Sequence, residues 1–213
     1  MYYGENGVYY LEDYATLIDN GETITERELD EDFNVISEKI YDSNRKPYKE
    51  LYYDSNGRLT EEKQYAASTG SFYIRYVTKY NADGTKTVTE YNKSNTAIKL
   101  MNYNKDGELE KEVDVLNGIV TKISKSWGET WITTEQYSQL IKLVIISADG
   151  KTRTEENTTY YASGNIKTVT VITTINDDNG AEIVYEKYCA VYDESQNIIS
   201  ETFYDKNGNV IEQ

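Results

Sequence analysis

The residues best suited to recognition chemistry lie in the segment SWGETW, where Trp127 and Trp131 flank Gly128 and Tyr137 follows soon after. A glycine between aromatic residues favours a tight hairpin end, at which both tryptophan rings can be presented together. Such a pair can cover an apolar centre of the fold, or it can form an exposed platform for a sugar ring or a protein partner. Both interpretations stay open, and Trp127, Trp131 and Tyr137 are the candidate binding residues.

Carboxylates are abundant, but their spacing does not suggest acid–base catalysis. The chain has 37 acidic residues, and adjacent pairs such as Glu61–Glu62 and Glu155–Glu156 would point to opposite faces of a strand. Histidine is absent, which removes the usual general base, zinc ligand and pH switch. The single cysteine, Cys189 in EKYCAVY, is typical of a small strand residue. We therefore expect no enzyme activity, no catalytic residue and no cofactor.

The turns DSNG, NKDG and DKNG invite a test for calcium binding. A helix–loop–helix calcium site needs oxygen ligands at loop positions 1, 3 and 5 and glycine at position 6. Counting back from Gly57 places Tyr52 at the first ligand position, so the spacing fails. The phosphate-binding patterns GxxxxGK[ST] and GxGxxG are also missing. The sequence predicts no metal site.

These turns belong to a repeated frame of Tyr, Asp or Asn, a spacer, Asn or Asp, and Gly. Asn-Gly and Asp-Gly are strong hairpin dipeptides because both residues tolerate positive φ. The first Asp or Asn, as in Asp54 or Asn81, can accept a hydrogen bond from turn amides, and the tyrosine can close the incoming strand. The residues expected to build these turns are Tyr53, Asp54, Asn56, Gly57, Tyr80, Asp83, Gly84, Tyr103, Asp106, Gly107, Tyr204, Asn207 and Gly208.

The turn centres recur with a period close to 12 residues. Phe33, Arg45 and Gly57 stand 12 apart, as do Asn95 and Gly107, and Gln196 and Gly208. Further turn candidates are Gly7, Gly21, Gly70, Gly84, Gly118, Gly128, Gly150, Gly164 and Gly180. About four turn residues per unit leave roughly eight for a strand. The pattern predicts an all-β chain, one long antiparallel meander forming a single repeat-built domain over residues 1–213.

The strands are polar on both faces. In RLTEEKQY, Leu59, Glu61 and Lys63 share one face, while Thr60 and Glu62 lie on the other. A sandwich strand would alternate sharply, so we expect an open or curved single sheet, wetted on both sides and stabilised by cross-strand pairs.

The middle of the chain is more apolar, and there we expect the sheet to curl over a small core near residues 116–175. Residues 133–144 could form a short helix with Thr133 and Gln136 as a capping box, but the β-branched residues that follow favour a strand.

Composition restricts the partners. With 22 tyrosines and a net charge of −15, the chain is ordered and acidic, and the phosphates of nucleic acids would be repelled. No apolar run reaches the roughly 18 residues of a membrane span, and MYYGENGVYY resembles no signal peptide. We expect a protein or polysaccharide partner, no nucleic acid and no membrane insertion. An extracellular or cell-surface location is favoured if a signal peptide has been removed, and a cytoplasmic one otherwise.

The segments YDSNGRLTEEKQY and YDKNGNVIEQ resemble the YD repeats of bacterial Rhs and wall-associated proteins. They are also similar to MORN-variant repeats of bacterial antitoxin and surface proteins. The resemblance covers about two thirds of the chain and implies long antiparallel strands and no catalytic residue, although the period is irregular around residues 128–150. The leading hypothesis is a non-catalytic bacterial repeat protein that acts as an interaction or surface scaffold. The alternatives are a glycan-binding module with an aromatic platform and an immunity-type inhibitor of a basic toxin.

Overall fold

The computed structural model describes residues 2–3, 8–11, 15–19, 22–66, 71–176 and 181–211. In these ranges the regular structure consists of strands only, so none of the described residues belongs to a helix that could cross a membrane. The all-β prediction is confirmed. The turns expected at Gly7, Gly21, Gly70 and Gly180 lie outside the described residues.

The chain divides into two compact units, residues 1–108 and 109–213. The first contains β1 (Tyr2–Tyr3), β2 (Val8–Leu11), β3 (Ala15–Asp19), β4 (Thr23–Leu29), β5 (Val35–Asp42), β6 (Pro47–Tyr53), β7 (Leu59–Ala66), β8 (Ser71–Tyr80), β9 (Lys86–Tyr91) and β10 (Ala97–Tyr103). The second contains β11 (Leu109–Asp114), β12 (Ile119–Ser126), β13 (Glu129–Gln136), β14 (Gln139–Ile146), β15 (Thr152–Tyr160), β16 (Ile166–Asn176), β17 (Glu182–Tyr192), β18 (Ile198–Tyr204) and β19 (Val210–Ile211). The expectation of one domain over 1–213 stays a prediction.

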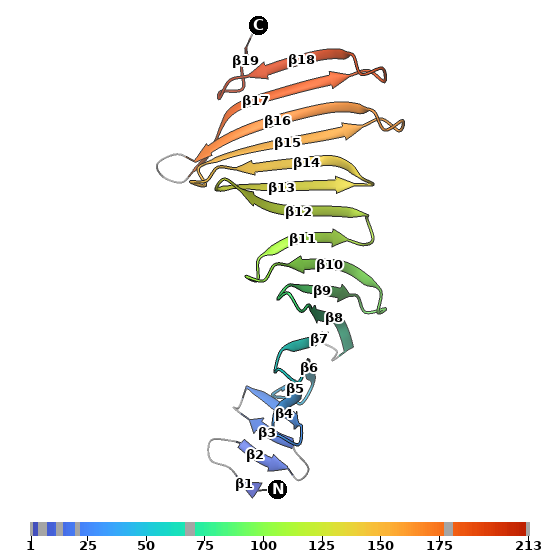
Figure 1. Cartoon of the computed structure of the whole chain (residues 1–213), viewed down its shortest axis with the longest axis vertical. Coiled ribbons are helices and arrows are strands. Elements are labelled where there is room, and N and C mark those ends of the chain that lie inside the picture. The colour runs from blue at the N-terminus through green and yellow to red at the C-terminus, as the bar shows by residue number, and fades with distance from the viewer. Residues whose placement is uncertain are drawn as a thin grey trace. The chain divides into compact units, whose positions relative to one another are not determined.

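Within each unit, every strand pairs antiparallel with the strand that follows it in the chain (Figure 1). The result is the predicted meander, and the sheet does not close. Because antiparallel strands alternate in direction, every second turn falls on the same edge of the sheet. In the first unit the turns after β4, β6 and β8 therefore share one edge.

Residues 133–144 form strands and a turn, so the strand prediction is confirmed and the helical alternative is wrong. The chain leaves β13 at Gln136 and enters β14 at Gln139 through a two-residue hairpin. Tyr137 and Ser138 both hold positive φ, at 50° and 66°. Positive φ at two consecutive positions matches the right-handed twist of the flanking strands.

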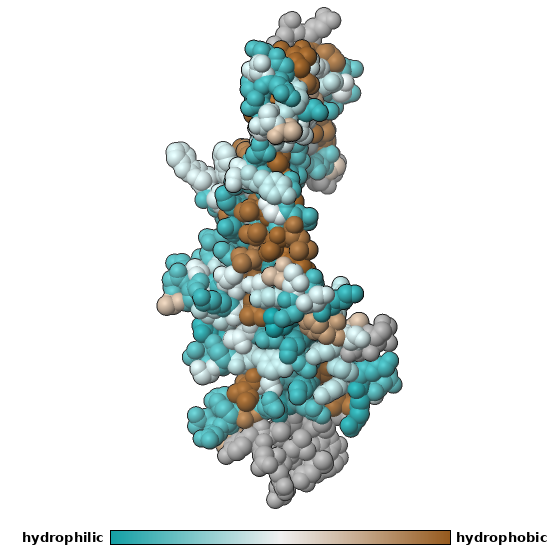
Figure 2. All heavy atoms as spheres, turned by 90° about the vertical axis from the view of Figure 1, so that its right-hand side faces the viewer, coloured by the Kyte–Doolittle hydropathy of each residue, from teal (hydrophilic) through white to brown (hydrophobic). Residues whose placement is uncertain are grey.

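The sheet has little interior. Among the described residues, the buried apolar side chains are Ile24, Val144 and Ala190, and only Val144 lies within the segment 116–175, where we expected a core. All eight residues of β7 are half-buried, which is the pattern of a strand wetted on both faces. On the face seen in Figure 2, apolar atoms form short stretches separated by polar ones.

The solvent-exposed area also indicates that the sheet has little interior. A compact monomer of this mass is expected to expose about 10,000 Å². This chain exposes 14068 Å². The strands therefore depend on their neighbours within the sheet more than on a second layer.

Polar pairs connect adjacent strands across both faces. Lys49 on β6 lies 3.0 Å from Glu62 on β7, and Lys142 on β14 lies 2.9 Å from Glu155 on β15. The Thr159 and Thr168 hydroxyls are 2.6 Å apart across β15 and β16. Each such pair contributes roughly 0.2–1 kcal/mol, so stability accumulates from strand to strand.

Candidate functional site

The repeated turn is closed by the first Asp or Asn of the frame. At the β6–β7 turn, the amide of Asp54 donates to the Arg58 carbonyl at 3.0 Å, and the amide of Gly57 donates to the Asp54 carbonyl at 2.9 Å. The Asp54 Oδ1 accepts from the amides of Asn56 at 2.9 Å and Arg58 at 3.0 Å. One carboxylate thus satisfies two turn amides, and the hydrogen bond from the Arg58 side chain, with those from the two amides, lowers the pKa of Asp54.

The same arrangement recurs along the chain. The side-chain Oδ1 accepts from the amide four residues ahead at Asp30, Asp42, Asp54, Asn92, Asn104, Asp193 and Asp205. All seven turn centres identified from the 12-residue period hold positive φ, including the non-glycine residues Phe33, Arg45, Asn95 and Gln196.

One turn differs from the expected role. At the β8–β9 turn, the amide of Thr85 donates to the Asp83 Oδ1 at 2.9 Å, so Asp83 takes the role that we expected for Asn81. In the turn that follows β10, the first Asn of the frame keeps the expected role, because the Asn104 Oδ1 accepts from the amides of Asp106 at 3.0 Å and Glu108 at 2.9 Å. The backbone geometry of the hairpin, and not the residue type alone, therefore decides which side chain accepts from the turn amides.

Two of the frame tyrosines reach back to an earlier strand. The Tyr53 hydroxyl donates to the Glu38 Oε2 at 2.8 Å, and the Tyr80 hydroxyl donates to the Leu59 carbonyl at 3.0 Å. Cations cover several of these rings: Arg58 lies 4.4 Å from the centroid of Tyr80, Lys86 5.0 Å from that of Tyr103 and Lys187 5.2 Å from that of Tyr204. The frame tyrosines are therefore engaged within the sheet.

Tyr53 also borders a polar hollow of about 470 Å³, which we call the tyrosine hollow. Its lining consists of Asn34, Val35, Glu38, Tyr53, Ser55, Asn56 and Gly57. Glu38 is already held by Tyr53 and by Arg27, whose Nε donates to it at 2.6 Å. Burial and the hydrogen bond to Glu38 raise the pKa of Tyr53 to about 12, so its hydroxyl stays protonated at neutral pH. The hollow offers hydrogen-bonding groups but no free base.

The adjacent carboxylates are separately engaged. Glu62 pairs with Lys49, while Glu61 lies 3.7 Å from Lys63. Glu155 accepts from Asn157 at 3.0 Å and from Arg153 at 2.6 Å. The hydrogen bond from Asn157, with those from Lys142 and Arg153, lowers the pKa of Glu155 to about 2. A carboxylate that is fully ionised at neutral pH is poorly suited to act as a general acid.

Trp127 and Trp131 lie together, and Tyr137 does not join them. Trp127 is 96% exposed in the turn between β12 and β13, and Trp131 is half-buried on β13, where its Nε1 donates to Glu129 Oε2 at 3.1 Å. Ser126, Trp127, Glu129 and Trp131 line a shallow hollow of about 480 Å³, the tryptophan hollow.

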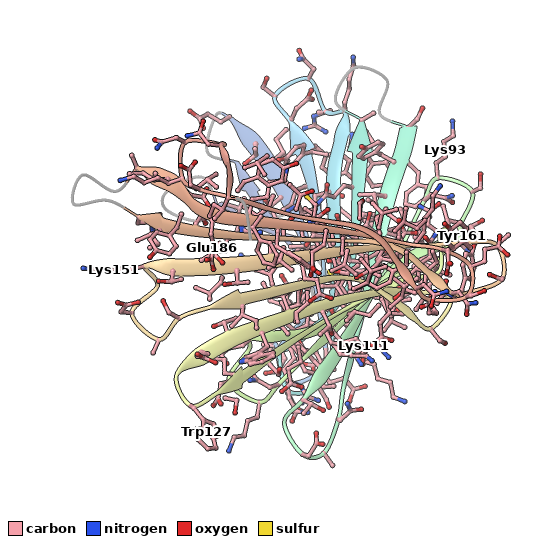
Figure 3. All side chains as sticks on the ribbon, turned by 90° about the horizontal axis from the view of Figure 1, so that it is seen from above. Lys93, Lys111, Trp127, Lys151, Tyr161 and Glu186 are labelled. Carbon is pink, nitrogen blue, oxygen red and sulfur yellow. The ribbon has the colours of Figure 1, made fainter. Side chains whose placement is uncertain are left out.

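Tyr137, 79% exposed, lies at the other end of the eight-residue strand β13, a span of about 26 Å. Figure 3 shows Trp127 and Lys151 on one side of the second unit and Tyr161 on the other. Tyr137 occupies the edge opposite Trp127 because one complete strand separates their turns.

The sequence reasoning missed a set of amide side chains that link turns along one edge of the second unit. Gln136 Nε2 donates to the Asn117 carbonyl at 3.1 Å, and Gln139 Nε2 donates to the Gly164 carbonyl at 3.2 Å. Asn165 Nδ2 donates to the Glu194 carbonyl at 2.7 Å. The available signal is that Gln or Asn stands directly beside each of these turns.

The exposed apolar residues at the start of β17 were also not predicted from the sequence. Ile183, Val184 and Tyr185 are exposed at 47%, 42% and 56%. The run IVY, apolar at successive positions, was the signal, because an alternating strand would carry a polar residue at every second position.

Among the residues that the structure describes, no group of three or more acidic or cysteine side chains could hold a metal ion.

Comparisons with known proteins find similarity only at the level of structure. No family model and no curated protein matches the chain. A porin-like protein from Bacteroides uniformis matches with a TM-score of 0.31 at 10% identity, over 85% of this chain and 74% of that one. A TcdB2–TccC3–Cdc42 structure matches at 0.29 and 13% identity, over 92% of this chain but only 12% of that one. A protein of unknown function from Bacteroides fragilis matches at 0.17 and 13% identity, over 90% of this chain and 88% of that one.

Proposed function

We propose that this chain is a non-catalytic repeat protein that serves as an interaction scaffold and binds another macromolecule, either a protein or a polysaccharide. The observation that supports this most strongly is the exposed surface of 14068 Å², well above the roughly 10,000 Å² of a compact chain of this mass. Exposed aromatic residues such as Tyr48, Tyr73 and Tyr185 add contact area at low entropic cost.

The chemistry of the side chains supports a binding role as well. Glu38, Glu62 and Glu155 are all engaged in ion pairs, and the tyrosine hollow and the tryptophan hollow are shallow. Enclosed pockets are typical of small-molecule sites, whereas broad open surfaces are typical of macromolecular interfaces.

We further propose that the repeats are related to bacterial YD repeats. The support is the Tyr–Asx frame, in which the Asx closes the turn and the tyrosine, at Tyr53 and Tyr80, reaches back to an earlier strand. Under this proposal the protein acts at a bacterial surface.

The proposal is tested by affinity capture from the native host, followed by hydrogen–deuterium exchange on the purified pair. We expect a saturable macromolecular partner that protects strand or turn amides of this chain. Failure to capture any protein or polysaccharide, or turnover of a small-molecule substrate by the purified chain, would contradict the proposal.

The tryptophan hollow favours a second candidate, a glycan-binding module. Trp127 is 96% exposed, and aromatic rings suit the apolar faces of sugars. Titration with oligosaccharides should shift the tryptophan fluorescence, and Trp127→Ala should abolish binding. Tyr137→Ala is the matched control, since Tyr137 is exposed at the opposite end of β13. Equal binding by both variants would rule out the hollow as the sugar site.

A further inference from the structure

The first half of β17 has an open edge. β18 pairs with β17 only from Lys187 to Tyr192. Residues 182–186 pair with β16 on their other side, and no described strand lies beside their outer edge. Figure 1 shows β17 extending past the end of β18. We call residues 182–186 the β17 edge. Its outward backbone groups can pair with a further strand.

The β17 edge is apolar and contains an irregularity that shapes a cavity. Thr174 pairs with Val184 and Thr173 with Glu186, which leaves Tyr185 as the extra residue of a β-bulge. The adjacent hollow has a volume of about 230 Å³ and is lined by Ile175, Ile183, Val184, Tyr185 and Lys206. Bulges re-aim side chains at sheet edges, and this one lies next to the apolar hollow.

Carboxylates bracket the β17 edge. The Thr174 hydroxyl donates to Glu182 at 2.7 Å, and the Thr173 hydroxyl donates to Glu186 at 3.3 Å. Because neighbouring strand residues alternate between faces, these contacts place one carboxylate on each face. Both glutamates are exposed, and Lys206 is the cation in the lining of the hollow. The charge of the edge therefore complements a basic ligand.

We propose that the β17 edge binds an extended, basic segment of another protein as an added antiparallel strand. Backbone hydrogen bonds would hold the segment in register, an apolar side chain on one face of the added strand would fill the hollow, and lysine or arginine side chains on its other face would face Glu182 or Glu186. A second copy of this chain fits less well, since two chains of net charge −15 repel each other. The inference rests on the proposed scaffold function and specifies the chemistry of its partner.

The first experiment uses synthetic probes on the intact protein. A fluorescein-labelled nine-residue peptide of alternating lysine and valine should bind saturably in fluorescence anisotropy, and the glutamate–valine counterpart should not. Methylation of alternate backbone nitrogens in the basic peptide should weaken binding about tenfold, because it removes the donors of an added strand. Equal binding of the methylated peptide would show that charge alone attracts it, and would overturn the proposal.

The second experiment locates the site. Val184→Lys places a cation in the β17 edge and should weaken binding of the basic peptide by about tenfold or more. Ile198→Lys, at a 54% exposed position of β18, is the matched control and should change affinity less than about twofold. Circular dichroism checks that both variants fold.

Three further outcomes overturn the proposal: no peptide binding, equal loss in both variants, or concentration-dependent self-association that Val184→Lys abolishes. Such self-association would mean that the β17 edge binds a second copy of this chain. A captured macromolecule that protects other strands would overturn the edge assignment and leave the scaffold function intact.

Discussion

At the scale of single residues, several non-glycine turn residues hold a strained, left-handed backbone conformation. Phe33, Arg45 and Gln196 hold φ values of 65°, 59° and 67° in turns where glycine is elsewhere used. The left-handed conformation costs an L-residue roughly 1–2 kcal/mol, whereas glycine adopts it freely. Several repeat units therefore carry this strain energy. The protein can tolerate it because the contributions of many neighbouring strands add to its stability.

Replacing a turn glycine by another residue should introduce the strain energy of the left-handed conformation and destabilise the protein. At Gly57 and Gly107, φ is 72° and 82°, and an added Cβ would meet no atom within 4 Å. We expect Gly57→Val and Gly107→Val each to lower the free energy of unfolding by about 1–2 kcal/mol through backbone strain alone. Urea denaturation measures this, and unchanged midpoints would contradict the turn assignment.

The converse substitution should stabilise the protein. Arg45 is exposed and occupies the position equivalent to Gly57 in the β5–β6 turn. We expect Arg45→Gly to raise the free energy of unfolding by about 0.5–1 kcal/mol, since relief of strain exceeds the added entropy of the unfolded chain. A destabilised Arg45→Gly variant, measured beside Arg45→Lys as the control for loss of the guanidinium, would contradict this.

Several of these residue-level features could be read from the sequence. The 12-residue spacing placed Phe33 and Arg45 in register with Gly57, and the structure gives all three positive φ. The acceptor at the β8–β9 turn was misassigned to Asn81, because Asp83 has equal hydrogen-bonding capacity and only the backbone geometry decides between them.

At the scale of elements, adjacent strands are joined by ionised side chains at partly exposed positions. Glu155 on β15 receives hydrogen bonds or ion pairs from Asn157, Arg153 and Lys142. The ion pairs require the carboxylate form, and the hydrogen bond from Asn157 is stronger to it than to the protonated acid. The pairing of β14 with β15 should therefore depend on pH.

Acid should weaken the protein within a defined window. The pKa of Glu155 is lowered from 4.5 to about 2 in the folded chain, so between these values the unfolded state binds more protons. The contribution of Glu155 is fully present above pH 4.5 and is lost as pH falls toward 2. We expect the unfolding free energy of Glu155→Gln to fall less steeply than that of the parent over this window. Urea titrations at pH 3, 4 and 6 measure both proteins. An equal fall of the unfolding free energy in the parent and in Glu155→Gln would contradict this prediction.

Strand identity was predictable, but strand length was not. The β-branched residues after residue 133 favoured a strand, and β13 and β14 confirm it. The β17 edge was not foreseen because it arises where the eleven residues of β17 outlast the seven of β18. Unequal lengths of neighbouring strands follow from pairing register, which a single sequence specifies weakly when both faces are polar.

At the scale of the whole molecule, the strands of both units are wetted on both faces. Three buried apolar side chains among the described residues are too few for a layered core. The exposed surface implies that folding buries about 60% of the area of the unfolded chain, compared with about 72% for a compact protein of this mass.

The most direct test of this claim is the heat-capacity change of unfolding, measured by scanning calorimetry with the monomer mass verified in solution. A compact protein of this length gives about 2.6–3.2 kcal/mol/K, in proportion to the surface that unfolding exposes. The open sheet predicts a value smaller by at least about one sixth. A value above about 2.7 kcal/mol/K, the upper end of the range for the open sheet, would mean that a second layer covers the faces and that the sheet is not wetted on both sides.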